Sequence, residues 1–222
     1  MKKIVLNIAL ATVVMSGFVA CKEKGTDATT GEAQEVAEAT ATAVDYQVNT
    51  EASQITWIGE KPTGKHHGTV QLASGMLAVT NGVIEAGTFS IDMNSITDLD
   101  LEGKMKENLE AHLKGTVEGK EGDFFNVTKY PFATFELTGI SENEGKSIVS
   151  GNLTIKEKTH AIEFLASTTS DENKVTLKSE SFQIDRTKWD VNYGSKSIFG
   201  DLGDKFINDM MELTVTIVAD KT

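Results

Sequence analysis

The feature that most restricts the fold of this chain is the alternation of apolar and polar residues in many short runs. In residues 89–94 (FSIDMN) every second residue is apolar, and residues 213–218 (LTVTIV) repeat the pattern. Successive side chains of a β-strand point to opposite faces, so such runs predict strands with one buried face. Similar runs occupy residues 55–60, 69–72, 134–137, 151–155, 161–166 and 174–182.

Turn-forming residues separate these runs at short intervals. Asn81-Gly82, residues 142–145 (ENEG) and residues 170–173 (SDEN) are typical of hairpin connections. Short strands joined by hairpins predict a mainly all-β fold, either a sandwich or a barrel.

One segment departs from the strand pattern. Leu101, Met105, Leu109 and Leu113 recur every four residues between charged residues, which predicts an amphipathic helix over residues 100–113. A helix placed among strands would cover an open edge or an open end of the sheet.

The first residues indicate export. A basic start at Lys2-Lys3 precedes residues 4–20, which carry no charge and are too short for a spanning helix of about 20 apolar residues. The following FVAC, ending at Cys21, resembles the lipobox of bacterial lipoproteins. This resemblance implies cleavage of residues 1–20 as a signal peptide and attachment of lipid to Cys21, the chain's one cysteine. Two or three acyl chains would hold the protein on a membrane, since each buried methylene contributes about 0.8 kcal/mol.

Composition divides the remaining chain. Residues 21–45 are rich in Ala, Thr and Glu and contain no aromatic residue, which predicts a flexible tether. Residues 46–222 have the length of one domain with one core. The net charge of −12 argues against nucleic acid as a partner and against electrostatic attraction to anionic lipid.

Three stretches of this domain resemble the YceI-like family of lipid-binding proteins. They are residues 123–140 (DFFNVTKYPFATFELTGI), which come after His112-Leu113, residues 151–164 (GNLTIKEKTHAIEF) and residues 182–194 (FQIDRTKWDVNYG). The similarity spans nearly all of residues 46–218. The resemblance implies an antiparallel eight-stranded lipocalin-like barrel, closed by a helix, that holds a long isoprenoid or acyl chain.

Side chains that point into such a barrel would either fill it or form the wall of a ligand cavity, and alternation does not distinguish the two. The apolar candidates for a ligand wall are Trp57, Val70, Phe89, Ile91, Phe135, Leu153, Phe164, Phe182 and Trp189.

Two polar residues are candidates for contact with a ligand head group. His112 would either hydrogen-bond a head group or satisfy carbonyls at the end of its helix. Arg186 is the only arginine in the chain, and a guanidinium can grip a carboxylate or phosphate with two parallel hydrogen bonds. The alternative for Arg186 is an ion pair with Asp185 or Asp190.

Motifs for catalysis are absent from the sequence. No HExxH motif, nucleophile elbow, phosphate loop or dinucleotide fingerprint occurs. The adjacent His66-His67 is interpreted as a loop or strand end. We therefore expect no enzymatic activity, no cofactor and no metal site.

The sequence thus predicts an exported lipoprotein, held on a bacterial membrane by Cys21, whose barrel binds or carries a long apolar lipid. The outer membrane facing the periplasm is the expected location, with exposure on the cell surface left open. The alternative is a structural or interaction lipoprotein with a filled barrel, and a lipid hydrolase or isomerase ranks last. A continuous apolar cavity would favour carriage. The oligomeric state is left open.

Replacing Cys21 with serine tests the predicted anchor. Cys21→Ser removes the thiol that would carry lipid, so the protein should move from the membrane to the soluble fraction and lose labelling by a radioactive fatty acid. Unchanged membrane association of the variant would contradict the lipoprotein prediction.

Overall fold

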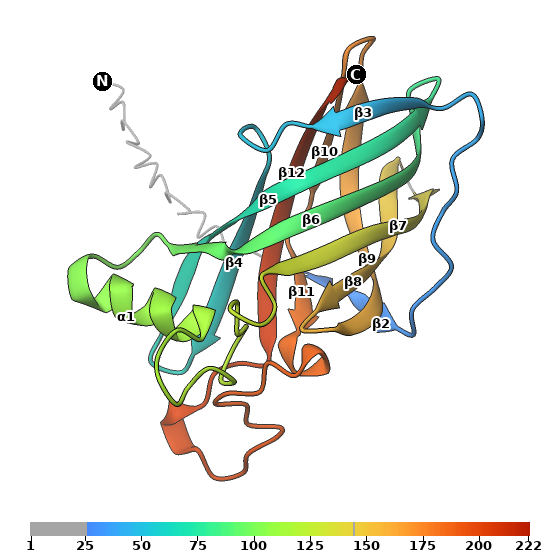
Figure 1. The fold of residues 1–222 in the computed structure, drawn as a ribbon. Helices are drawn as coiled ribbons and strands as arrows, with labels where there is room; N and C mark the ends of the chain where they lie inside the picture. Colours follow the sequence, from blue (N-terminus) through green and yellow to red (C-terminus); the bar gives the residue numbers. More distant parts are fainter. Residues whose placement is uncertain (1–25, 144) are drawn as a thin grey trace, which may run out of the picture.

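Eight antiparallel strands form a closed ring in the computed structural model, which describes residues 26–143 and 145–222 (Figure 1). The strands are β4 (Gln54–Lys61), β5 (Gly64–Thr80), β6 (Val83–Asp98), β7 (Phe132–Asn143), β8 (Lys146–Ile155), β9 (Lys158–Ser170), β10 (Lys174–Ser179) and β12 (Met210–Lys221). Each strand from β4 to β10 pairs with the next along the chain, and β12 pairs with both β10 and β4. The predicted all-β fold of eight antiparallel strands with one helix is confirmed.

Two further strands extend the ring at its ends. β3 (Val44–Val48) pairs with β5 and with the last residues of β12, and β11 (Phe182–Asp185) pairs with the first residues of β12. The predicted run 174–182 is therefore two strands, β10 and β11, which pair with different stretches of β12. β3 was not among the strands predicted from the sequence.

The predicted tether differs from what the structure shows for residues 26–45. β1 (Thr26–Asp27) pairs in parallel with β11, and β2 (Thr29–Gly31) pairs with β9. β1 and β2 thus cover edges of β11 and β9 that would otherwise be unpaired. The free N–H and C=O groups of an exposed strand edge readily pair with another segment of chain. A composition poor in apolar residues does not prevent pairing through the backbone, which holds this segment in place.

A single buried side chain holds the next part of this segment. Asn152 on β8 accepts a hydrogen bond from the backbone N–H of Gln34 at 2.9 Å and donates one to the carbonyl of Gln34 at 2.7 Å. Further along, the carboxylate of Glu85 accepts hydrogen bonds from the backbone N–H and hydroxyl of Thr40. Residues 26–45 are thus attached to the outside of the ring. Residues 1–20 and Cys21 lie outside the described residues.

The helix α1 (Gly103–Lys114) lies where the sequence predicts one, but it begins three residues later. Its start is delayed because a carboxylate oxygen of Asp98 accepts hydrogen bonds from the backbone N–H groups of Asp100 and Leu101, which fixes a turn there. Gly115, with a left-handed φ of 69°, ends the helix. Among the described residues, no helix has the length and apolar character needed to cross a membrane.

One end of the ring carries most of the irregular structure (Figure 1). Here lie α1, the 3₁₀ helices η1 (Arg186–Trp189) and η2 (Gly203–Lys205), and the connection 190–209 that leads into β12. We call this the loop end of the ring.

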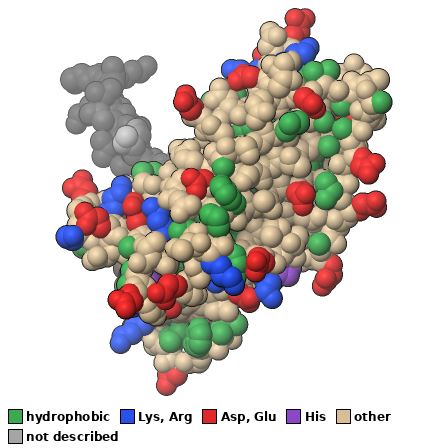
Figure 2. Space-filling view, viewed as in Figure 1, with side chains coloured by type: hydrophobic (Ala, Val, Ile, Leu, Met, Phe, Trp, Pro, Cys, Tyr) green, Lys and Arg blue, Asp and Glu red, His purple; other side chains and the backbone are tan. Residues whose placement is uncertain are grey.

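The surface view shows acidic side chains spread over the visible face and a group of hydrophobic side chains at its lower end, where the connection 190–209 lies (Figure 2). In that connection, Ile198 and Phe199 are 52% and 48% exposed.

The core consists of side chains that point into the ring, and close packing there needs a glycine at position 151. A Cβ on Gly151 would lie 2.1 Å from the ring of Phe135 and 2.7 Å from the carbonyl oxygen of Glu136. The flat aromatic ring therefore rests directly on the backbone of β8.

We expect Gly151→Ala to lower the free energy of unfolding by about 1–3 kcal/mol, the usual effect of overpacking a core. Denaturant unfolding measures the change. Gly139→Ala on β7 is the matched control, because a Cβ there meets no atom within 4 Å. Equal stability of the two variants would show that Phe135 does not pack as described.

Candidate functional site

The ring encloses an apolar cavity of about 380 Å³. This volume falls within the roughly 300–1,000 Å³ typical of small-molecule sites. A cavity of this size favours the predicted ligand-binding interior over the filled one. Of the predicted apolar wall residues, those that line the cavity are Trp57, Val70, Phe89, Ile91, Phe135, Leu153, Phe164 and Phe182.

Four phenylalanines form a continuous row on the cavity wall. The ring centroids of Phe89 and Phe135 are 6.2 Å apart, and those of Phe135 and Phe164 are 6.0 Å apart. Phe164 stacks on Phe182 at 4.4 Å with nearly parallel planes. The row takes one ring each from β6, β7, β9 and β11, and it forms a surface that attracts apolar chains and offers them no hydrogen bonds.

Polar lining residues are concentrated at the loop end. They come from the hairpin between β4 and β5, from α1, and from the residues between β11 and β12. They are Glu60, Lys61, His66, His112, Arg186, Tyr193 and Asn208. The cavity therefore has a long apolar part and one polar end.

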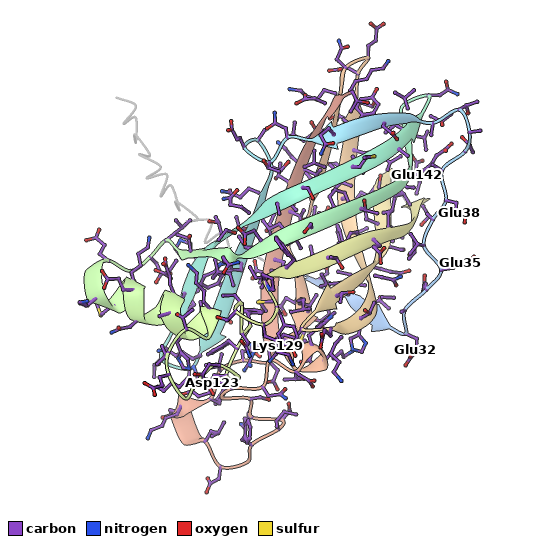
Figure 3. All side chains as sticks on the ribbon, viewed as in Figure 1. Glu32, Glu35, Glu38, Asp123, Lys129 and Glu142 are labelled. Carbon is purple, nitrogen blue, oxygen red and sulfur yellow. The ribbon has the colours of Figure 1, made fainter. Side chains whose placement is uncertain are left out.

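One of the two roles predicted for His112 was to satisfy carbonyl groups at the end of its helix. Its side chain bonds to Asp123 instead. Its Nε2 lies 2.6 Å from a carboxylate oxygen of Asp123. Asp123, labelled in Figure 3, lies in the connection that follows α1. The rings of Phe124 and Tyr193 meet the imidazole edge to face at 5.0 and 4.8 Å. His112 thus joins α1 to the connection that follows it and to the connection 190–209 at the polar end of the cavity.

Arg186 is buried and bonded mainly to backbone. Its guanidinium donates to the carbonyl oxygens of Asn208, Val191 and Ile207. Burial lowers the pKa of Arg186, and the charge of Asp209, 3.7 Å away, opposes this effect. The predicted ion pair with Asp185 or Asp190 is wrong as to its partner. Arg186 lines the cavity, but its main contacts hold the connection 190–209 in place.

Trp189 does not line the cavity. It is fully buried, its indole N–H donates to the carbonyl oxygen of Leu153 at 3.0 Å, and His160 packs against its ring. Because η1 turns the chain after β11, Trp189 no longer follows the alternation that predicted an inward position.

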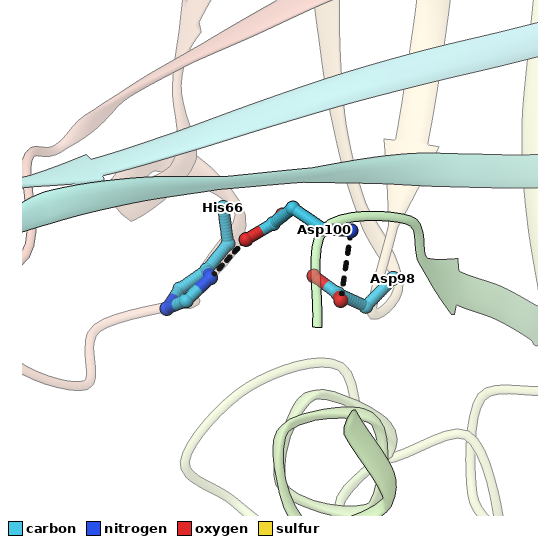
Figure 4. Close-up of side chains that lie close together, drawn as sticks. All are labelled: His66, Asp98 and Asp100. Carbon is cyan, nitrogen blue, oxygen red and sulfur yellow. Dashed lines mark hydrogen bonds and ion pairs between the residues drawn. The ribbon is translucent and has the colours of Figure 1, made fainter. Parts of the chain in front are cut away.

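One group of metal-ligating residues lies beside the cavity, where the sequence predicts none. His66, Asp98 and Asp100 each offer a ligand atom within 4.8 Å of the other two (Figure 4). The sequence showed no recognisable spacing, because His66 comes from β5 and the two aspartates from the end of β6 and the residues after it. Only the pairing of the two strands brings them together.

Comparison with known proteins gives a consistent result. The sequence model of the YceI-like domain matches residues 46–219. The fold is similar to the crystal structure of BcnA from Burkholderia cenocepacia, with a TM-score of 0.59 and 20% identity over 78% of this chain and 99% of that one. It is also similar to a polyisoprenoid binding domain from Saccharophagus degradans, with a TM-score of 0.57 and 12% identity over 81% of this chain and 99% of that one. Among curated protein sequences, none matches this chain.

We expect Arg186→Lys to destabilise the protein, because an ammonium group cannot reach three carbonyl oxygens in one plane. Hydrogen bonds to a charged group contribute about 1.5–3 kcal/mol, and a loss of at least that size should appear in denaturant unfolding. Limited proteolysis should cut first within residues 190–209.

Lys158→Ala is the control for this variant, since its ion pair with Asp190 is exposed and should contribute little. Retention of full stability and of the native cleavage pattern by Arg186→Lys would contradict the role of Arg186 in holding the connection.

Proposed function

This chain belongs to the YceI-like family, and we propose that it binds a long-chain apolar lipid, a polyisoprenoid or a fatty-acyl derivative, inside its ring of strands. The observation that supports this best is the shape of the cavity wall. A wall that is apolar over most of its length, with polar groups at one end, fits a molecule that has an apolar chain and a polar head.

The orientation of the ligand follows from this division. We propose that the chain lies along the aromatic row from Phe182 to Phe89 and that the head group stays at the loop end. Lys61 and Tyr193 line the cavity there and would supply a positive charge and a hydroxyl group. Arg186 is a weaker candidate than the sequence indicated, because its donors already bond to carbonyl oxygens.

The similar domain from Saccharophagus degradans is described as polyisoprenoid binding, which supports an isoprenoid as one class of ligand for this chain. The aromatic wall is compatible with either class, since it makes no polar contact that would distinguish an isoprenoid from an acyl chain. We propose binding without catalysis.

Membrane attachment through Cys21 is a further part of the proposal. Cys21 precedes Thr26 by five residues, which limits their Cα atoms to about 18 Å apart. Thr26 pairs with Phe182, a residue of the cavity wall. Lipid on Cys21 would therefore hold the ring close to the bilayer, in contrast to the longer separation that a flexible tether of residues 21–45 implied.

Electrostatic attraction would not assist this attachment. Glu32, Glu35 and Glu38 are exposed along the outer segment, and their side chains point away from the ring (Figure 3). Ile198 and Phe199 at the loop end offer exposed apolar surface that would favour contact with the membrane.

Filling the cavity tests ligand binding directly. In Leu153→Phe and Val70→Phe, a larger apolar side chain occupies space in the cavity without adding polarity: Leu153 pairs with Phe135 of the aromatic row, and Val70 lines the cavity on β5. We expect at least a fivefold weaker uptake of a fluorescent long-chain fatty acid, measured by fluorescence titration. The loss of stability should be below the roughly 1–3 kcal/mol that overpacking causes in a solid core.

Val83→Phe is the matched control, because the same substitution falls on a side chain that is 64% exposed. It should leave uptake unchanged. Absence of uptake by the parent protein, together with large destabilisation by both cavity variants, would instead favour a structural or interaction protein.

A further inference from the structure

His66, Asp98 and Asp100 meet where β5 and β6 separate. Gly68 on β5 pairs with Asp98 on β6, and the space beside Gly68 is so small that a Cβ there would lie 1.9 Å from the carbonyl oxygen of Thr97. The backbone N–H of Leu99 then donates to the carbonyl of His67. The end of β6 is therefore fixed tightly against β5.

Asp98 has an unusual environment for a carboxylate. It is fully buried, and one oxygen accepts hydrogen bonds from the backbone N–H groups of Asp100 and Leu101. The other oxygen, Oδ2, is buried and has no hydrogen-bond partner in the described part of the chain. A buried charge without a partner is costly, and buried carboxylates are normally paired, hydrogen-bonded or bound to a metal.

Asp100 is held in position by the two histidines. One carboxylate oxygen lies 2.9 Å from Nδ1 of His66. The other accepts a hydrogen bond from the backbone N–H of His67 at 2.6 Å and lies 3.3 Å from its Nδ1.

We propose that His66, Asp98 and Asp100 bind one divalent transition-metal cation, for which Zn²⁺ is the appropriate probe. The unpartnered Oδ2 of Asp98, a carboxylate oxygen of Asp100 and the imidazole of His66 supply the three protein ligands (Figure 4). The cation compensates the charge of the buried carboxylate. Water completes the coordination, as in zinc sites with three protein ligands.

The distances and the types of donor atom support this class of ion. Two ligands bound at about 2.0–2.2 Å in tetrahedral geometry lie about 3.3–3.6 Å apart, so Nδ1 of His66 and the Asp100 oxygen, now 2.9 Å apart, need to separate by only about half an ångström to hold a cation. An imidazole among the ligands favours zinc and other first-row metals over Mg²⁺ and Ca²⁺, which prefer oxygen. His67 contacts the carboxylate oxygen of Asp100 that His66 does not contact, and it would orient this ligand without binding the cation itself.

The metal site shares His66 with the polar end of the lipid cavity. Metal binding is therefore measured without lipid, and loss of either property leaves the other open to measurement.

The test uses the full-length protein in detergent, treated with EDTA and dialysed, with ZnCl₂ titrated by isothermal calorimetry. We expect one Zn²⁺ per chain. Asp98→Asn keeps a side-chain oxygen for the turn but removes the charge. It should weaken Zn²⁺ binding at least about tenfold, because even the loss of a group that only supports a metal ligand typically costs that much affinity.

His66→Ala is the second variant, because it removes a ligand without changing the turn that Asp98 holds, and it should weaken binding to a similar degree. Asp123→Asn is the control. Asp123 belongs to the other close histidine–aspartate pair, with His112, for which no third ligand lies nearby among the described residues. Zn²⁺ binding by folded His66→Ala with the parent's affinity and stoichiometry, or absence of binding by the parent, would overturn the proposal.

Discussion

Closure of the ring is the constraint on which the rest of the structure depends. β4 pairs with β5 on one side and with β12 on the other, so backbone groups of the first and last long strands satisfy each other. Closure removes the open edges that a flat sheet would expose, and it also fixes an interior whose size depends on the number of strands. An eight-stranded ring is just wide enough for either a packed core or one ligand. In this protein, large side chains such as Phe135 lie flat against glycine backbone, which leaves space at the centre.

The alternation of the sequence was sufficient to predict strands and their inward residues because its period of two assigns each side chain to a face. Phe89, Phe135 and Phe164 line the cavity for this reason. The same reasoning failed at Trp189, because a 3₁₀ turn intervenes and the period no longer applies. The partners of His112 and Arg186 could not be predicted either. Asp123 and the carbonyls of the 190–209 connection come from segments without a periodic pattern, and only the folded ring brings them near.

The segment before β3 shows a different limit of sequence reasoning. Its composition gives too little apolar surface to form a core of its own. Order in residues 26–45 arises from another source, since the backbone of β1 and β2 pairs with strand edges and Asn152 bonds both backbone groups of Gln34. Backbone pairing leaves no signature in composition, because every residue except proline can provide it. Whether a segment beside a sheet is ordered therefore depends on the unpaired strand edges that it can reach, as well as on its composition.

The loop end of the cavity contains two buried charges whose environments differ in an informative way. Arg186 is surrounded by carbonyl oxygens and by Asp209, so its donors are satisfied within the chain and its role is to hold the connection 190–209 in place. Asp98 has backbone partners for one oxygen and none for the other. A satisfied buried charge stabilises one conformation, whereas an unsatisfied one lowers stability until something binds it. The two buried charges at this end of the ring therefore have different roles. Arg186 is a structural residue, and Asp98 is the residue whose environment the proposed cation completes.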